Sequence, residues 1–332
     1  MKFEMKTKRD FLSFFDLNDG EVLALVRRAE ELRFLRSIRA AHATRPGRVL
    51  AMIFEKASTR TRVSFEAAIF DLGGHGIILG KNDSQIGRGE PVRDTARVLS
   101  GYCHAVMVRT FGQETIEELA RYASIPIING LTDLLHPCQL LADLQTVYAH
   151  YSGGYGRAVS ATASAPAGSA ADVATVLGQV RYAWIGDGNN MANSWIEAAG
   201  TLGLDLALAF PPGYEPDAQV LARARATGRG KIVLTHDPRE AAAGRQVIST
   251  DVFASMGQEG EADERRRAFA NFCVDGALMK TAAPDAIVLH CLPAHRGEEI
   301  SDDVIEGPQS RVFQQAENRL HAQKALLEWI LA

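Results

Sequence analysis

A chain of 332 residues is longer than one compact core of ordinary size and is long enough for two domains. With 46% hydrophobic and 23% charged residues the composition is that of a globular protein, and no run approaches the roughly 20 apolar residues that cross a bilayer. The net charge of -4, without a basic stripe interleaved with aromatic residues, argues against nucleic acid as the main partner.

The amino-terminal segment mixes acids and bases and has no apolar core before a small-residue cleavage site, so it does not resemble a secretory signal. No two of the four cysteines form a Cys-x-x-Cys pair, and this spacing favours free thiols over a zinc ribbon or a disulfide framework. They are Cys103, Cys138, Cys273 and Cys291. We therefore expect a cytoplasmic protein.

Apolar runs alternate with amphipathic stretches along the chain. In the first half, strand-like segments at 48–55, 75–80, 105–110 and 125–130 enclose helix-like segments at 62–74, 94–102 and 115–124. In the second half, a strand-like segment at 181–185 precedes a helix-like one at 194–203, and further strand-like segments follow at 204–210, 231–237, 246–250 and 286–289. This rhythm predicts an α/β fold with two doubly wound parallel-sheet domains joined by interdomain helices.

The predicted first domain is residues 1–148, completed by a carboxy-terminal helix at 315–332, and the second is residues 149–314. Residues 151–178 are dominated by Ala, Gly and Ser and have almost no large apolar side chain. We expect this segment to be a flexible insertion at the domain boundary.

A polar cluster follows the first strand, where residues 58–62 read Ser-Thr-Arg-Thr-Arg directly before a helix. Hydroxyls, the free backbone N–H groups of a helix start and two guanidinium groups together suit a phosphate. A capped helix with solvated arginines is the alternative. Two arginines in the first turn, however, oppose the helix dipole unless an anion is present, so we predict a phosphate site.

A second cluster lies at the carboxyl end of strand 125–130, where an open α/β sheet places its ligand crevice. A histidine before a proline is, by itself, more often structural. Together the two clusters resemble the carbamoyl-phosphate site of the aspartate and ornithine transcarbamylases, and the resemblance covers nearly the whole chain outside the insertion. The residues that carry it are Glu55-Lys56-Ala57 with residues 58–62, His136-Pro137-Cys138-Gln139, and Leu141-Ala142-Asp143.

The resemblance implies a role for each donor-site residue. It implies that the phosphate is held by Ser58, Thr59, Arg60 and Thr61, that Arg109 bridges phosphate and carbonyl oxygen, and that His136 and Gln139 address the carbamoyl group. Arg319 matches an arginine that returns to this site from the carboxy-terminal helix. Gln85 matches a loop that enters a neighbouring subunit's site, which implies at least a trimer with shared active sites.

The segment 250–259 resembles the ornithine-specific loop of the ornithine branch, with Phe253 where Trp is more familiar. Asp251 would hold the free α-amine, Ser255 offers a hydroxyl, and a backbone N–H near Met256 would take the α-carboxylate. A Ser-Met-Gly turn capped by aspartate is the alternative interpretation.

Residues 186–188 follow a strand like the start of a dinucleotide fingerprint, but Met191 occupies the third glycine position. Asp205, the acid that would bind a ribose, lies at the start of a strand rather than at its end. By resemblance this turn instead supplies an amide to the ornithine backbone, from Asn190 or the adjacent Asn189, and we assign it to Asn190.

His290-Cys291-Leu292-Pro293 ends the last strand. A buried cysteine at a strand end is usually inert. The resemblance nevertheless implies that Cys291 and the Leu292 carbonyl lie near the carbamoyl phosphate and the reacting amine. The Leu292–Pro293 bond is a candidate cis peptide, which is cheap before proline.

These motifs imply carbamoyl transfer to the side-chain amine of L-ornithine, with catalytic roles for Arg109, His136, Asp251 and Cys291 and with no metal or organic cofactor. Putrescine and an N-acylated ornithine stay open as acceptors. Aspartate is disfavoured, because the loop offers acidic and hydroxyl groups where a second carboxylate would need basic ones. A nucleotide-binding oxidoreductase would rest on residues 186–188 alone.

Overall fold

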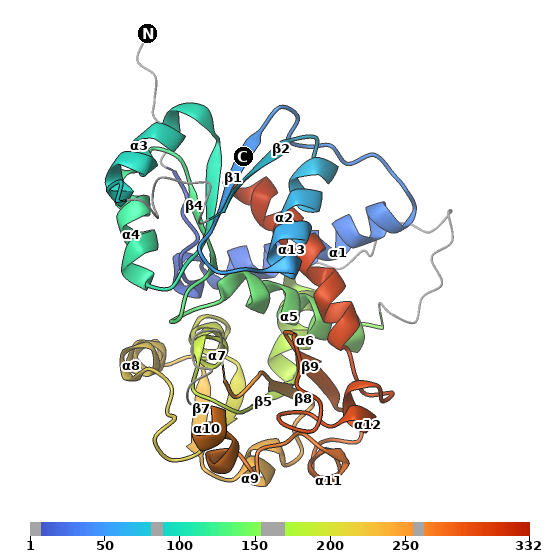
Figure 1. The fold of residues 1–332 in the computed structure, drawn as a ribbon. Helices are drawn as coiled ribbons and strands as arrows, with labels where there is room; N and C mark the ends of the chain where they lie inside the picture. Colours follow the sequence, from blue (N-terminus) through green and yellow to red (C-terminus); the bar gives the residue numbers. More distant parts are fainter. Residues whose placement is uncertain (1–7, 81–88, 154–169, 255–261) are drawn as a thin grey trace.

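The computed structural model describes residues 8–80, 89–153, 170–254 and 262–332. In these residues the chain forms two sheets whose strands all run parallel, with helices packed around them, which confirms the predicted α/β class (Figure 1). None of the helices found there is both long and apolar enough to cross a membrane.

The first sheet has the strand order β2-β1-β3-β4. Its strands are β1 (Val49–Phe54), β2 (His75–Gly80), β3 (Ala105–Arg109) and β4 (Ile127–Leu131). The helices of this half are η1 (Phe14–Asp16), α1 (Asp19–Ser37), α2 (Thr59–Asp71), α3 (Val92–Tyr102), α4 (Gln113–Tyr122) and α5 (Pro137–Tyr151). The chain leaves β1 towards β2 and then returns to the other side of β1 for β3, so the strand order reverses between β1 and β3. Open sheets bind ligands outside the carboxyl ends of the strands at such a point.

The second sheet has the order β7-β6-β5-β8-β9 and reverses between β5 and β8. Its strands are β5 (Arg181–Ile185), β6 (Asp205–Ala209), β7 (Lys231–Thr235), β8 (Val247–Thr250) and β9 (Ile287–His290). Its helices are α6 (Ala170–Gln179), α7 (Asn190–Leu202), α8 (Ala218–Ala226), α9 (Pro238–Ala242), α10 (Ala262–Ala268), α11 (Gly276–Met279) and α12 (Asp302–Ile305). The turns after β5 and β8 are therefore the second expected ligand position.

The last helix, α13 (Val312–Ile330), connects the two halves. In Figure 1 it runs, in red, from the lower body that contains β9 to the upper body that contains α2. It packs against α1, α2 and α5, and its Leu326 and Leu327 are fully buried in a core that also contains Trp184 and Trp195 of the second half. One hydrophobic core thus continues through both halves, and α13 brings carboxy-terminal residues next to the start of α2.

Part of the segment 151–178, which was expected to be a flexible insertion, is helical. Residues 170–178 belong to α6, and Val173 and Leu177 on that helix are buried in the core. The prediction of a flexible insertion is therefore wrong for residues 170–178, because two apolar side chains four residues apart lie on one helical face and can be buried together. Residues 154–169 lie outside the described residues, and the exact domain limits stay a prediction.

Candidate active site

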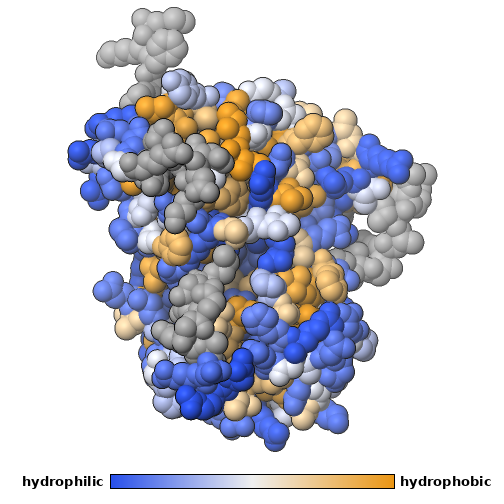
Figure 2. Space-filling view, viewed as in Figure 1, coloured by the Kyte–Doolittle hydropathy of each residue, from blue (hydrophilic) through white to orange (hydrophobic). Residues whose placement is uncertain are grey.

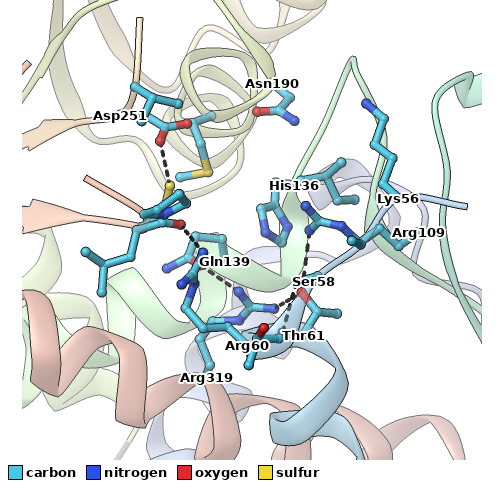
Figure 3. A pocket seen from close by; sticks show the side chains of 18 of the residues that line it. Lys56, Ser58, Arg60, Thr61, Arg109, His136, Gln139, Asn190, Asp251 and Arg319 are labelled. Atoms are coloured by element: carbon cyan, nitrogen blue, oxygen red, sulfur yellow. Dashed lines mark hydrogen bonds between the residues drawn. The ribbon is translucent and has the colours of Figure 1, made fainter. Parts of the chain in front are cut away.

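A cavity of about 290 Å³ lies between the carboxyl ends of the two sheets (Figure 3). Its lining comes from the last residues of β3 and β4, from the segments that follow β1, β4, β5, β8 and β9, and from α13. The cavity therefore joins the switch points of both sheets, where ligands are expected. The lining residues are Lys56, Ala57, Ser58, Thr59, Arg60, Thr61, Arg109, Leu131, Asp133, His136, Gln139, Asn190, Met191, Asp251, Val252, Cys291, Leu292, Pro293 and Arg319.

The start of α2 forms one wall of this cavity. Ser58 is the N-cap of the helix, and its hydroxyl accepts a hydrogen bond from the Thr61 backbone N–H at 3.2 Å. Arg60 lines the cavity, whereas Arg62 is exposed and is not part of its lining. Of the two guanidinium groups in this turn, only that of Arg60 therefore faces the cavity, because residues two apart on a helix point in nearly opposite directions.

Two arginines from distant segments take the place of Arg62. Arg109 at the end of β3 and Arg319 on α13 each direct a guanidinium nitrogen to within 3.5 Å of the Thr61 hydroxyl oxygen (Figure 3). Both are buried, and the Nε atom of each has no hydrogen-bond partner among the described residues. Arg60 donates to the Leu292 carbonyl at 2.8 Å.

These three arginines form a concentrated positive charge. Within the described parts of the chain, no salt bridge joins a carboxylate to Arg60, Arg109 or Arg319. Burial lowers the pKa of Arg109 to about 10, and the neighbouring Arg319 adds to this effect. Burial also lowers the pKa of Arg319. Guanidinium groups that are buried side by side without a counterion favour an anionic ligand.

His136 lies beside these arginines at the start of α5. Its backbone N–H donates to the Ser194 hydroxyl at 2.8 Å, which ties the first half of the chain to α7 of the second. Burial, with added repulsion from Arg319 and Arg109, holds the pKa of His136 well below its ordinary value. Its Nδ1 has no hydrogen-bond partner in the described residues. The imidazole is therefore neutral at pH 7.

The opposite wall carries Asp251, which follows β8, and Cys291, which follows β9. The thiol of Cys291 donates to Asp251 Oδ1 at 3.0 Å (Figure 3). Burial raises the pKa of Cys291 well above its ordinary value, and the Asp251 carboxylate adds to the rise. Burial also raises the pKa of Asp251, and the nearby His290 and the hydrogen bond from Cys291 oppose the rise. Cys291 is thus a neutral hydrogen-bond donor at pH 7 rather than a thiolate.

The two asparagines after β5 have different surroundings. Asn190 lines the cavity and donates to the Thr132 carbonyl at 2.7 Å. Asn189 is the N-cap of α7, and its Nδ2 lies 3.3 Å from Asp251 Oδ2. Asn190 is therefore the one of the two that faces the cavity directly.

The glycines of residues 186–188 have a structural explanation. A Cβ atom at Gly188 would lie 2.3 Å from backbone atoms of Glu215 and Pro216, so the close approach of that segment requires glycine. Asp187 in the same turn pairs with Arg265 at 2.7 Å. This turn thus uses its glycine for packing against the neighbouring backbone.

Lys56 and Asp133 are lining residues to which the sequence analysis assigned no role. The Lys56 ammonium forms an ion pair with Asp133 and lies 4.2 Å from the centre of the Phe111 ring. Asp133 lies just after the carboxyl end of β4. Its position in the sequence therefore predicts a place at the ligand crevice, as it does for His136. Gln85, Ser255 and Met256 lie outside the described residues.

One group of potential metal ligands borders the cavity: Asp251, His290 and Cys291 present ligand atoms within 4.8 Å of one another. These atoms already bond within the protein. His290 Nε2 lies 3.1 Å from Glu299, its Nδ1 accepts from the Leu292 N–H at 2.9 Å, and Cys291 donates to Asp251. The Leu292–Pro293 peptide that follows is cis, as expected.

Comparison with known proteins agrees with this geometry. The model of the carbamoyl-phosphate-binding domain of aspartate/ornithine carbamoyltransferases matches residues 9–149, and that of the Asp/Orn-binding domain matches residues 178–330. A protein named ornithine carbamoyltransferase from Pelobacter propionicus is 54% identical over 323 residues, which are 97% of this chain and 98% of that protein. Another of that name from Geobacter sulfurreducens is 51% identical over 319 residues, covering 96% and 98% of the two chains.

A solved structure of ornithine carbamoyltransferase from Pyrococcus furiosus has a TM-score of 0.85 and 45% identity, covering 97% of this chain and 96% of that chain. The one from Burkholderia thailandensis has a TM-score of 0.83 and 41% identity, covering 97% and 98%. Family models for both halves, relatives that match over nearly their whole length and a shared fold all agree. The chain belongs to the aspartate/ornithine carbamoyltransferase family.

Proposed function

We propose that this chain transfers the carbamoyl group of carbamoyl phosphate to the side-chain amine of L-ornithine, giving L-citrulline and phosphate. One observation carries the proposal: a single cavity has, on one side, three guanidinium groups that pair with no carboxylate of the described residues and, on the other, the buried carboxyl of Asp251. The first side suits a phosphate and the second suits an ammonium group. The relatives named ornithine carbamoyltransferase support the same acceptor.

In the proposed complex the start of α2 holds the phosphate through its backbone N–H groups, the hydroxyls of Ser58, Thr59 and Thr61, and Arg60. Arg319 binds the phosphate from the side of α13. Arg109 bridges the phosphate and the carbonyl oxygen. His136 and Gln139, which both line the cavity, address the carbamoyl group, and the imidazole is neutral because burial lowers its pKa.

The acceptor lies against the second half of the chain. Asp251 pairs with the α-ammonium group, Asn190 and Ser255 contact the amino-acid end, and a backbone N–H near Met256 takes the α-carboxylate. Cys291 and the Leu292 carbonyl lie beside the reacting amine. An aspartate acceptor would place its second carboxylate against Asp251, which the repulsion between the two disfavours.

The reaction requires a neutral amine. An ornithine side-chain amine with a pKa near the 10.4 of lysine costs roughly 4 to 5 kcal/mol to deprotonate at pH 7. The guanidinium groups across the cavity disfavour the protonated, cationic form of this amine and so lower its pKa. The amine nitrogen then forms a bond to the carbonyl carbon, the carbon–oxygen bond to phosphate breaks, and the departing phosphate accepts the released proton.

The charge that develops has identifiable partners. We propose that Arg109, His136 and Thr61 stabilise the carbonyl oxygen as it becomes an oxyanion. Arg60 and Arg319 stabilise the departing phosphate. Each of these side chains already lines the cavity. Neither a metal nor an organic cofactor takes part in the proposed steps.

We further infer an assembly of at least three subunits, with Gln85 of the partner subunit entering the site. Exposed hydrophobic side chains on the first half support a subunit contact, among them Val63 and Phe70 on α2 and Ile77 on β2. Figure 2 shows such side chains gathered on the upper body, above a more hydrophilic lower body. The cytoplasmic location expected from the sequence stays a prediction.

An acceptor panel tests the proposal. Citrulline formation from carbamoyl phosphate is measured with ornithine and compared with carbamoylation of N-acetylornithine, putrescine and aspartate. We expect ornithine to have the highest kcat/KM. A higher kcat/KM for any of the other three would refute the assignment of the acceptor, and no transfer to any amine would refute the assignment of the reaction.

A further inference from the structure

Asp143 on α5 lies at the centre of a buried hydrogen-bond chain beside the cavity. Its side chain is fully buried and is not part of the cavity lining. One carboxyl oxygen, Oδ1, accepts from the Gln139 amide nitrogen at 2.8 Å and from the Gln315 amide nitrogen at 2.6 Å. Asp143 therefore holds one glutamine of its own helix and one of α13.

The direction of each hydrogen bond fixes both amide groups. The Gln139 side-chain oxygen accepts from an Arg319 guanidinium nitrogen at 2.7 Å. The Gln315 side-chain oxygen accepts from the His290 backbone N–H at 2.9 Å. Guanidinium and backbone N–H groups only donate, so reversal of either amide would place donor against donor. Asp143, as the acceptor between them, is consistent with one orientation only.

The two ends of this chain lie on opposite walls of the cavity. One end passes from Gln139 to Arg319, whose other terminal nitrogen lies 3.5 Å from the Thr61 hydroxyl. The other end reaches His290, the last residue of β9 and the neighbour of Cys291. Through Asp143, the proposed phosphate wall and the proposed acceptor wall are connected by side chains of α5 and α13.

We propose that Asp143 is a positioning residue for carbamoyl transfer: through Gln139 it holds Arg319 at the phosphate wall, and through Gln315 it holds the end of β9 that precedes Cys291. This inference rests on the proposed function. It also explains why Asp143 is buried without touching the cavity. Burial of a carboxyl group costs free energy unless hydrogen bonds compensate for the lost hydration, and here the two glutamine amides donate such bonds.

The role depends on an acceptor oxygen and not on a full negative charge. Burial raises the pKa of Asp143 to about 7. Its second oxygen, Oδ2, has no hydrogen-bond partner among the described residues. A proton on Oδ2 leaves Oδ1 free to accept from both glutamines. Asparagine, whose amide carries one such oxygen, should therefore keep the chain, whereas alanine removes it.

Four variants test the proposal. Asp143→Ala removes the acceptor, Asp143→Asn keeps it, and Gln315→Leu cuts only the arm towards β9. Thr146→Val is the matched control: Thr146 is fully buried one turn further along α5 and accepts from Asn318 of α13 at 2.8 Å, and neither of these two residues lines the cavity. For each variant, kcat, both KM values, the Kd of inorganic phosphate by calorimetry and the thermal unfolding midpoint are measured.

We expect Asp143→Ala to raise the KM for carbamoyl phosphate and the Kd of phosphate about tenfold or more, since small displacements of binding groups have effects of this size. Asp143→Asn should stay within about threefold of the parent protein. Gln315→Leu should raise the KM for ornithine more than the KM for carbamoyl phosphate. Thr146→Val should lower the unfolding midpoint and leave both KM values unchanged.

Several outcomes would overturn the proposal. Parent-like KM and Kd values in Asp143→Ala would reduce Asp143 to a structural role, as would effects matched by Thr146→Val. If Asp143→Asn were as impaired as Asp143→Ala, the effect of Asp143 would be purely electrostatic, and positioning would be refuted. If Asp143→Ala does not fold, the Asp143→Asn and Gln315→Leu variants test the proposal. A parent-like KM for ornithine in Gln315→Leu would contradict the arm that runs from Asp143 to β9. A parent protein that forms no citrulline would instead refute the proposed function, while phosphate binding would still test Asp143.

Discussion

The replacement Asp251→Asn tests whether Asp251 recognises the α-ammonium group of the proposed acceptor or acts on its reacting side-chain amine. Asp251 is only 8% exposed, and asparagine keeps an oxygen that can accept from Cys291 while removing the negative charge. Loss of one partner from a buried, hydrogen-bonded charge pair costs about 2 to 5 kcal/mol. At about 1.4 kcal/mol per tenfold change, we expect kcat/KM for ornithine to fall by roughly 30-fold to a few thousandfold, with little change in the KM for carbamoyl phosphate.

A second acceptor serves as the internal control for this experiment. 5-Aminopentanoate has the reacting amine and the carboxylate of ornithine but no α-ammonium group, so its weaker carbamoylation should be nearly the same in Asp251→Asn and in the parent protein. Steady-state citrulline and ureido-acid assays at pH 8 measure both acceptors, and thermal unfolding verifies that the variant is folded. An equal loss with both acceptors would refute the reasoning, because Asp251 would then act on the reacting amine.

Three other results are expected. Arg319→Lys keeps a charge but loses the fork that reaches both Gln139 and Thr61, so the KM for carbamoyl phosphate should rise about tenfold or more in steady-state assays, and an unchanged KM would contradict the role of α13. Burial raises the pKa of Glu197 to about 7, so its protonated form stabilises the folded state at low pH and this contribution is lost as the pH rises towards 7. Glu197→Gln should therefore gain stability relative to the parent between pH 5 and pH 8 in urea unfolding, and a relative loss would show the reverse linkage. Because the Cys291 thiol stays protonated, iodoacetamide at pH 8 should modify it slowly in the folded protein and quickly in urea, as read from peptide masses; fast modification of the folded protein would contradict the raised pKa.

Some features of the site could be predicted because they are local in sequence. A strand, a short turn and a helix start follow one another around residues 58–62, so the hydroxyls, the N-cap and Arg60 are fixed by neighbouring residues. The alternation of strand-like and helix-like segments likewise gave the α/β class, because each segment carries its own periodicity.

Other features of the fold are also encoded locally in the sequence. Helix α1 was not predicted, although Val22, Leu25, Val26 and Ala29 are buried at the spacing of one helical face. The same periodicity assigns Arg60 and Arg62 to different faces of α2, so the exposure of Arg62 was predictable as well.

The meeting of the site residues was decided by the tertiary structure alone. Arg319 reaches Thr61 across 258 residues because α13 packs back onto α2, and Lys56 pairs with Asp133 because β1 and β4 end at the same edge of one sheet. The link from Asp143 to His290 depends on where α13 lies between α5 and β9. By itself the sequence determined which groups each strand end offers. Sheet order and helix packing determined which of those groups face one another, since long-range contacts depend on how whole elements pack and not on the residues next to them.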